Sequence, residues 1–409
     1  MVKFRTSWIF DVVFFVVICS GILILWNIAG YWEGNSSPKS VNTKVVPSVT
    51  SSVDLPSVES KNNAGGGGSG GWGPMPAESN RNYATVKVFF GTDRNEAETI
   101  NSNTIFGVKR SDKVRYGVCE VSVPRDHRMG VLESSSLYRF EFKEDPEKHV
   151  VLLKTRILEE SKFFSDLADR VRGSDKNDAF IFVHGYNVSF EDAARRTAQI
   201  SYDLGFKGAP VFYSWPSQGA VGKYTFDEQS VEWTQTHLKK FLWDFMRHSD
   251  AQKVYLIAHS MGNRALVRAV TSFLKDKPSF INRISEVILT APDIDADVFK
   301  TDIAPALVDL GRPVTLYASS KDVALKASKE VHGFPRAGDS GAGLVVIPGI
   351  ETIDATNVDT GLLGHSYFAE AKSVISDMFY IIRDDQRADK RFGLYSIDSR
   401  FGRYWQFKP

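Results

Sequence analysis

The sequence predicts an α/β fold with a mainly parallel, doubly wound sheet and helices on both of its faces. Two observations lead to this expectation. Short apolar segments without polar alternation recur along the chain, which is typical of strands buried on both faces. Helical stretches separate these segments, and strands that alternate with helices usually pair in parallel. The predicted strands are residues 179–183, 211–213, 254–257, 287–289 and 314–317, and the predicted helices are residues 190–204, 227–247, 263–274, 297–308 and 366–382.

A β-rich segment precedes this alternating region. Its strand candidates are residues 85–90, 116–123, 137–142 and 149–153. In the second of these, Cys119, Val121 and Val123 share one face of the strand, because successive side chains point to opposite sides. We therefore expect Cys119 in the core and not as a reactive thiol.

Composition restricts the classes of function. The chain has 409 residues, with 50 Lys+Arg and 49 Asp+Glu, so its formal net charge of +1 gives no reason to expect nucleic acid as a partner. The sequence contains two cysteines, Cys19 and Cys119, which excludes a disulfide framework and a cysteine-based zinc site. Residues 293–297 carry three aspartates, but Val298 stands where a calcium loop requires glycine. We expect no metal and no cofactor.

Residues 1–32 have the composition of a short cytoplasmic segment followed by a transmembrane helix. Lys3 and Arg5 precede an apolar run over residues 8–29, which is long enough for one bilayer crossing. Positive residues before a span keep the amino terminus in the cytoplasm. The remainder is then expected on the exported, periplasmic side of the inner membrane. A cleaved signal peptide is the alternative, but the run ends without a good small-residue cleavage site.

Three further parts follow this anchor. Residues 33–82 are rich in Ser, Pro and Gly, including the glycine run at 65–71, and are expected to be a disordered linker. Residues 83–383 form the predicted folded domain. Residues 384–409 are predicted to be a basic, aromatic tail, for which packing on the domain surface is favoured over contact with lipid headgroups.

One short motif indicates the chemistry. The predicted strand 254–257 runs into the turn Ala258-His259-Ser260-Met261-Gly262, which leads directly into a helix. A serine between small residues two positions away on each side, in a strand–turn–helix context, is the pattern of a nucleophile elbow. Ser260 is therefore the predicted nucleophile. The alternative is a buried serine or a helix-capping serine.

A serine hydroxyl needs a histidine base before it attacks efficiently. On folds with such an elbow, the chain order is serine, acid, histidine, which leaves His365 and His332 as candidates. We predict His365, because it lies in a glycine-flanked loop just before the last helix. His332 is the alternative, and loop histidines are often merely solvated.

The acid that orients the histidine is assigned by position. Asp322 lies just past the predicted strand 314–317, where the acid of such a triad is expected. Asp293 and Asp295, after the preceding strand, are the competitors. Each of these aspartates could instead cap a helix.

Attack on a carbonyl creates an oxyanion that needs backbone N–H donors. One donor is the amide of the residue after the nucleophile, Met261, and the other usually comes from a loop after an earlier strand. The loop His184-Gly185-Tyr186-Asn187 has this place, so we predict the Tyr186 amide as the second donor. His184 is expected to brace the loop, and His259 to pack beside the elbow.

The combination of these motifs resembles a known superfamily, the α/β-hydrolases. More narrowly, four segments together resemble a bacterial esterase/lipase-like family that is catalogued as a domain of unknown function. They begin at Tyr116-Gly-Val-Cys-Glu, Phe182-Val-His-Gly-Tyr, Ser214-Trp-Pro-Ser and Ala258-His-Ser-Met-Gly. The resemblance covers about residues 85–382, and it implies an α/β-hydrolase fold and esterase activity.

Residues and resemblance together predict a membrane-anchored serine hydrolase. Ser260, His365 and Asp322 would form the triad, and the Tyr186 and Met261 amides the oxyanion hole. The expected substrate is a small-molecule or lipid carboxylic ester, cleaved through an acyl-enzyme. Two rivals remain open: an amidase or peptidase with the same triad, because the triad serves both reactions, and a catalytically silent hydrolase fold that acts as an envelope scaffold or binding protein.

Overall fold

The computed structural model describes residues 81–97, 105–135, 143–220, 222–358 and 372–408. All of them fall within the unit Ser69–Pro409. The predicted anchor lies outside the described residues, as does the predicted linker except for its last two positions. Within the described ranges, no helix combines the length and apolar character that a bilayer crossing requires.

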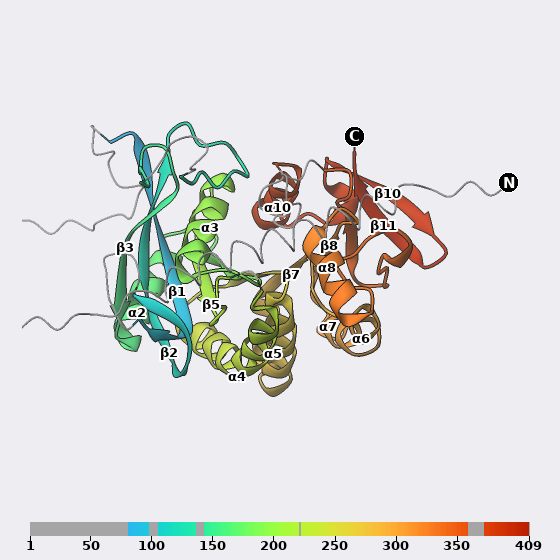
Figure 1. The fold of residues 1–409 in the computed structure, drawn as a ribbon, viewed down its shortest axis with the longest axis horizontal. Coiled ribbons are helices and arrows are strands. Elements are labelled where there is room, and N and C mark those ends of the chain that lie inside the picture. The colour runs from blue at the N-terminus through green and yellow to red at the C-terminus, as the bar shows by residue number, and fades with distance from the viewer. Residues whose placement is uncertain (1–80, 98–104, 136–142, 221, 359–371, 409) are drawn as a thin grey trace, which may run out of the picture. The chain divides into compact units, whose positions relative to one another are not determined.

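Eleven strands of the described part of the chain form one sheet, in the order β10-β11-β9-β8-β7-β6-β4-β5-β1-β2-β3 (Figure 1). From β11 to β1 all neighbouring strands are parallel, whereas β2, β3 and β10 add antiparallel pairs at the two edges. The predicted, mainly parallel sheet is therefore confirmed. The strands are β1 Tyr83–Glu96, β2 Phe106–Pro124, β3 Val151–Leu158, β4 Asp178–Val183, β5 Ala209–Ser214, β6 Lys253–His259, β7 Ile284–Thr290, β8 Val314–Ala318, β9 Glu351–Asp354, β10 Leu394–Ser399 and β11 Gly402–Phe407.

Helices cover both faces of this sheet. Residues of α2, α4, α5 and α7 share one core, and residues of α3 and α10 share the other (Figure 1). Strand β4 supplies both cores by alternation, since Ile181 and Val183 enter the first and Phe180 and Phe182 the second. The helices are α2 Glu160–Arg172, α3 Phe190–Asp203, α4 Tyr224–His248, α5 Gly262–Asp276, α6 Ala296–Val298, α7 Ala304–Val308, α8 Val323–His332 and α10 Lys372–Asp384.

The amino-terminal strands extend further than the sequence predicts. β1 and β2 continue past the predicted ends and pair along most of their length, and β3 begins two residues later than predicted. The predicted strand at 137–142 lies outside the described residues. Cys119 of β2 is fully buried, as expected, and burial raises the pKa of its thiol to about 12.

The segment expected to form a carboxyl-terminal tail is instead the edge of the sheet. β10 and β11 form an antiparallel hairpin, and β11 pairs in parallel with β9. Leu394 and Phe407 are buried in the core. Arg391 is buried as well and forms ion pairs with Asp377 and Glu351, each at 2.8 Å. The basic composition of this segment does not predict the buried ion pairs of Arg391, because the partner carboxylates belong to other elements, β9 and α10.

Other elements also depart from the expected list. The predicted helix 297–308 is α6, a π-helical turn at Phe299–Ile303 and α7 in succession. The described part of the last predicted helix, 366–382, is α10. Helices α2 and α8 and strand β9 are not among the predicted elements. Strand β9 contributes only four residues, too few for a periodic signal.

Candidate active site

Ser260 occupies a sharp turn between β6 and α5. Its φ of 51° lies in the left-handed region, which costs a non-glycine residue roughly 1–3 kcal/mol. Strand β6 ends at His259 and α5 begins at Gly262, so the chain reverses within two residues. A side chain at position 262 would place its Cβ only 2.3 Å from the His184 carbonyl oxygen. The turn therefore has the geometry of a nucleophile elbow and requires glycine at 262.

Hydrogen bonds to neighbouring segments hold this strained turn. The Ser260 amide donates to the Thr290 carbonyl at 2.9 Å, and the Ser260 carbonyl accepts from the Asp293 amide at 3.2 Å. The Asn263 side-chain amide donates to the Ser260 carbonyl at 2.9 Å and to the Thr290 carbonyl at 3.1 Å. The end of β7 and the first turn of α5 thus share the task of fixing the backbone of Ser260.

The loop after β4 packs directly against the elbow. A Cβ added to Gly185 would lie 2.8 Å from the Ser260 Cβ and 3.0 Å from His259 Nδ1, so this loop approaches the serine closely only because position 185 is glycine. Among the residues that the structure describes, the backbone N–H groups of Tyr186 and Met261 have no hydrogen-bond acceptor. The two predicted oxyanion donors thus belong to segments that meet at Ser260.

His184 braces this loop, as expected. Its ring stacks on Trp215 with the centroids 5.0 Å apart, and the Trp215 indole donates to the His184 carbonyl at 2.7 Å. Its Nε2 lies 3.2 Å from Ser214 Oγ. Burial, together with the nearby Arg94 guanidinium, lowers the pKa of His184 to about 3, so the imidazole is neutral. His259 is also buried and packs beside Gly185.

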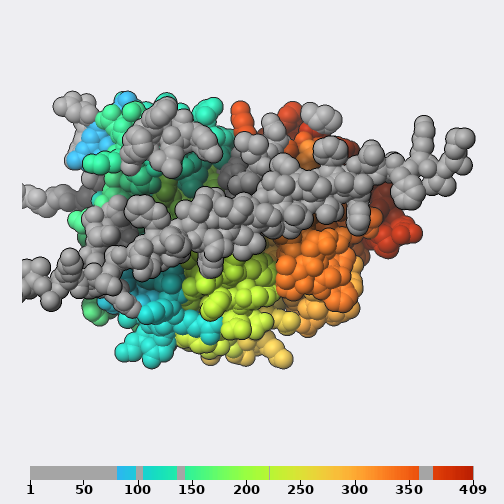
Figure 2. Space-filling model, viewed as in Figure 1, coloured from blue at the N-terminus to red at the C-terminus, as the bar shows by residue number. Residues whose placement is uncertain are grey.

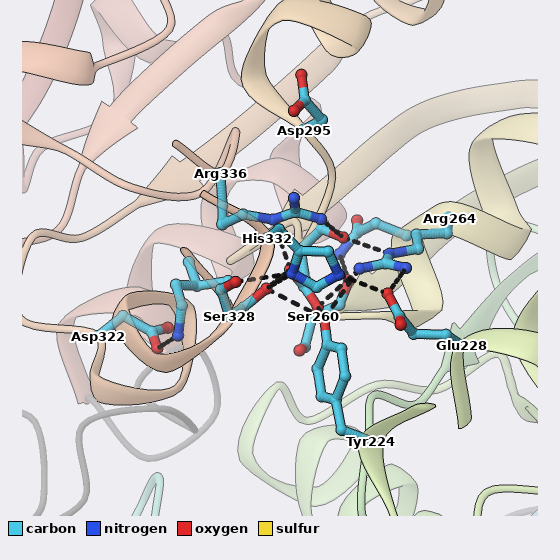
Figure 3. Close-up of polar contacts among 12 residues, drawn as sticks. Tyr224, Glu228, Ser260, Arg264, Asp295, Asp322, Ser328, His332 and Arg336 are labelled. Carbon is cyan, nitrogen blue, oxygen red and sulfur yellow. Dashed lines mark hydrogen bonds and ion pairs between the residues drawn. The ribbon is translucent and has the colours of Figure 1, made fainter. Parts of the chain in front are cut away.

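Asp322 follows β8 and is fully buried. Its Oδ1 accepts from the Leu325 amide at 2.9 Å and so caps α8. Asp322 therefore caps α8 and lies after β8, the strand next to β7, where the sequence predicts the acid. Asp295, one of the two competitors, caps α6 through the amides of Asp297 and Val298, and Figure 3 shows it apart from the residues around Ser260.

Asp293, the other competitor, is the centre of a buried polar cluster. Its Oδ1 accepts from Arg336 at 2.8 Å and from Ser328 at 2.6 Å, and its Oδ2 accepts from Tyr224 and from Arg264, the latter at 3.2 Å. Figure 3 shows these four side chains converging beside Ser260. Burial alone would raise the pKa of Asp293, but the two guanidinium groups and the hydrogen bonds from Ser328 and Tyr224 together outweigh it, and the pKa is lowered. Asp293 thus holds four partners beside the elbow.

His332 contacts this cluster through both ring nitrogens. Nδ1 lies 2.7 Å from the Ser328 carbonyl oxygen, and Nε2 lies 2.8 Å from the Glu228 carboxylate. Both nitrogens thus contact groups other than the Ser260 hydroxyl. His365, the predicted base, lies outside the described residues. In the sequence it follows β9, which is the next strand after β8 in the sheet.

The cluster around Asp293 was not predicted from the sequence. Arg264 is visible in the elbow motif, four residues after the nucleophile, but no local pattern links Ser328 or Arg336 to it. Around Arg264 and Arg336 opens a groove of about 490 Å³, whose lining includes Glu228, Ile294, His332 and Phe334. On the face shown in Figure 2, the orange surface around α8 adjoins the yellow-green surface around α4, in agreement with the contacts of Tyr224 and Glu228 to α8.

Comparison with known proteins identifies the family of the chain. Residues 159–383 match the family described as an alpha/beta hydrolase of unknown function (DUF900). The chain belongs to this family. Its sheet and elbow agree with this assignment, and the predicted resemblance is confirmed. No curated protein matches the chain.

The chain also matches solved structures of esterases at low identity. Naproxen esterase from Bacillus subtilis is 12% identical, with a TM-score of 0.30, and the match covers 51% of this chain and 84% of that one. Carboxylesterase CesB from Bacillus subtilis is 11% identical, with a TM-score of 0.30, over 56% of this chain and 100% of that one. A Pyrococcus furiosus esterase is 15% identical, with a TM-score of 0.27, over 52% and 84%.

Proposed function

We propose that the protein is a serine hydrolase that cleaves carboxylic esters. The observation that carries this proposal is the conformation of Ser260: a serine with φ of 51° at the end of a central parallel strand, packed against Gly185 of the neighbouring loop. Strain of this kind persists only where the surroundings impose it, and it concentrates at functional sites. A serine that merely capped α5 would not need it.

Topology supports the rest of the triad. Strands β6, β7, β8 and β9 are adjacent and parallel, so their carboxyl ends meet at one edge of the sheet, where chemistry collects on such folds. Ser260 follows β6, Asp322 follows β8, and His365 follows β9 in the chain. This is the serine, acid, histidine order of the hydrolase triad.

In the proposed reaction, Ser260 Oγ attacks the ester carbonyl while His365 takes its proton. The Tyr186 and Met261 amides stabilise the oxyanion. The protonated histidine, held by Asp322, gives its proton to the leaving alcohol, and an acyl-enzyme remains. Water, deprotonated by the same histidine, then releases the acid and restores the serine.

Hydrolysis of p-nitrophenyl esters by the full chain tests this proposal. We expect activity in the native protein and a loss of at least about 10³-fold in Ser260→Ala and in His365→Ala. His332→Ala, the matched control, should keep most of the native kcat. Activity that persists in His365→Ala but disappears in His332→Ala would reassign the base, and full activity in Ser260→Ala would refute the nucleophile.

We further propose that residues 8–29 anchor the enzyme in the inner membrane, with the folded domain on the exported side. The support is the sequence alone: an apolar run of bilayer length that follows Lys3 and Arg5. An alkaline phosphatase reporter fused after Pro409 should be active, and the protein should resist extraction by carbonate. A reporter that is active only in the cytoplasm would contradict the orientation.

A further inference from the structure

Arg94 is buried at the end of β1, and within the described ranges no carboxylate forms an ion pair with it. Its side chain is 1% exposed, and its hydrogen bonds go to neutral oxygens. Nε donates to Ser214 Oγ at 2.9 Å, Nη1 to the Ser217 carbonyl at 2.9 Å and Nη2 to the Val188 carbonyl at 2.8 Å. Removal of a cation from water costs several kcal/mol, so an arginine at this position calls for a compensating role.

The partners of Arg94 show what that role is. Val188 lies in the loop after β4, which contacts Ser260 through Gly185, and Ser214 and Ser217 lie at the end of β5 and just beyond it. The planar guanidinium therefore connects two loops at the carboxyl edge of the sheet. Ser214 Oγ, which accepts from Arg94, also lies 3.2 Å from His184 Nε2. His184 is the first residue of the loop after β4.

Asp227 also forms hydrogen bonds with both of these loops. This buried side chain, in the first turn of α4, accepts from the Asn187 amide at 3.2 Å, from Ser217 Oγ at 2.6 Å and from the Gln218 amide at 2.8 Å. The Val188 amide in turn donates to Ser217 Oγ at 3.1 Å. Asn187, with φ of 56°, directly follows Tyr186. Tyr186, the predicted oxyanion donor, thus lies between Gly185, which packs against Ser260, and Asn187, which is hydrogen-bonded to Asp227.

We propose that Arg94 and Asp227 are positioning residues that set the Tyr186 amide against the nucleophile. The inference rests on the proposed function. Neither residue touches the reacting atoms; each acts through the loop 184–188. A rigid, fork-shaped donor is required at position 94, because a lysine ammonium cannot reach three oxygens in one plane. Loss of this fixation should affect the transition state, where the oxyanion forms, more than substrate binding.

Steady-state kinetics and inhibitor binding of the full chain test this inference. We expect Arg94→Met to lower kcat about 100-fold, the effect of one oxyanion donor, with KM changed less than about threefold. Affinity for a boronic acid that mimics the tetrahedral intermediate should fall in parallel. Arg94→Lys and the isosteric Asp227→Asn should give smaller losses of the same kind. These variants keep the test decisive if Arg94→Met does not fold.

Arg283 provides the matched control. It also donates to main-chain carbonyls, those of Ala251 and Met246, but it lies at the opposite ends of the strands. Arg283→Met should lower the melting temperature and leave kcat within about twofold. A folded Arg94→Met protein with native kcat, or with kcat and KM changed no more than in Arg283→Met, would overturn the inference. A native protein inert towards both esters and fluorophosphonates would instead refute the proposed function itself.

Discussion

At the scale of single residues, the site depends on close approaches that leave no space for a side chain. Gly262 and Gly185 allow the loop after β4 to lie against Ser260, and the proposed oxyanion hole depends on this proximity. The elbow motif predicts the small residue at 262 directly. The need for glycine at 185 follows only from the packing of two distant segments.

Substitution of Gly262 by alanine tests whether this close packing requires glycine. Its Cβ would meet the His184 carbonyl at 2.3 Å and the Val183 carbonyl at 2.7 Å, so we expect a loss of about 1–3 kcal/mol in unfolding free energy and a large fall in kcat. Gly343→Ala, whose nearest neighbour would be 4.0 Å away, is the control. Equal urea midpoints for the two variants would contradict the packing argument.

Asp322 caps α8 and is also the proposed triad acid, and these two roles can be tested separately. Asparagine caps helices about as well as aspartate, but it cannot stabilise a charged histidine. Asp322→Asn should therefore change the unfolding free energy by less than about 1 kcal/mol and lower kcat by up to about 10⁴-fold. Asp295→Asn, at the cap of α6, should leave both quantities near native. Native kcat in Asp322→Asn would show that Asp322 only caps α8.

At the scale of elements, pairs of buried charges connect the loops and helices around the sheet. Arg336 connects the segment after α8 to Asp293, with both side chains almost fully buried. Arg336→Met would leave the buried Asp293 carboxylate with Arg264, Ser328 and Tyr224 as partners, and the loss of a charged hydrogen bond should destabilise the protein by about 2–3 kcal/mol. Arg403→Met, which breaks the exposed pair with Asp398, should change stability by less than about 1 kcal/mol. Similar urea denaturation curves for the two variants would refute this distinction.

The loop after β2 is held to α3 by a histidine between two carboxylates. His127 lies 2.7 Å from Glu133 and 2.8 Å from Asp203. Burial disfavours the charged imidazole, but the hydrogen bonds and charges of Asp203 and Glu133 outweigh it and raise the pKa of His127 to about 9. Because the folded state binds this proton more tightly than the unfolded state, its stabilisation is complete below about pH 6.5 and disappears as the pH rises to about 9.

Melting temperatures of the native protein and His127→Gln across that range test the assignment. The native protein should lose its advantage over the variant between about pH 6.5 and 9. A difference in melting temperature that stays constant from pH 6 to pH 10 would show that the imidazole does not carry this charge in the folded state.

At the scale of the whole molecule, the carboxyl-terminal hairpin completes the sheet. Truncation after Asp385 removes Leu394 and Phe407 from the core and leaves Asp377 without Arg391. We therefore expect the truncated protein to be insoluble or to melt well below the native protein. An unchanged melting temperature would mean that this segment is a dispensable tail, as its composition alone suggests.

Much of this architecture could be predicted from the sequence. The buried strands β4 to β8 and helices α3, α4 and α5 have strong, uninterrupted patterns, and the elbow has a local signature. The pairing of the hairpin with β9, the cluster around Asp293 and the Arg94 connection could not be predicted, because each depends on residues brought together from distant segments. Arg391 reads as a surface cation until its partners on β9 and α10 are known.

The nucleophile can be tested by covalent labelling of the full chain, purified in detergent. A fluorophosphonate should add one phosphonyl group per chain as fluoride leaves, and peptide mapping by mass spectrometry should locate that group on Ser260. Ser260→Ala should show no added mass under the same conditions. Labelling at another residue, or equal labelling of the native protein and Ser260→Ala, would contradict the assignment of this strained turn as the catalytic elbow.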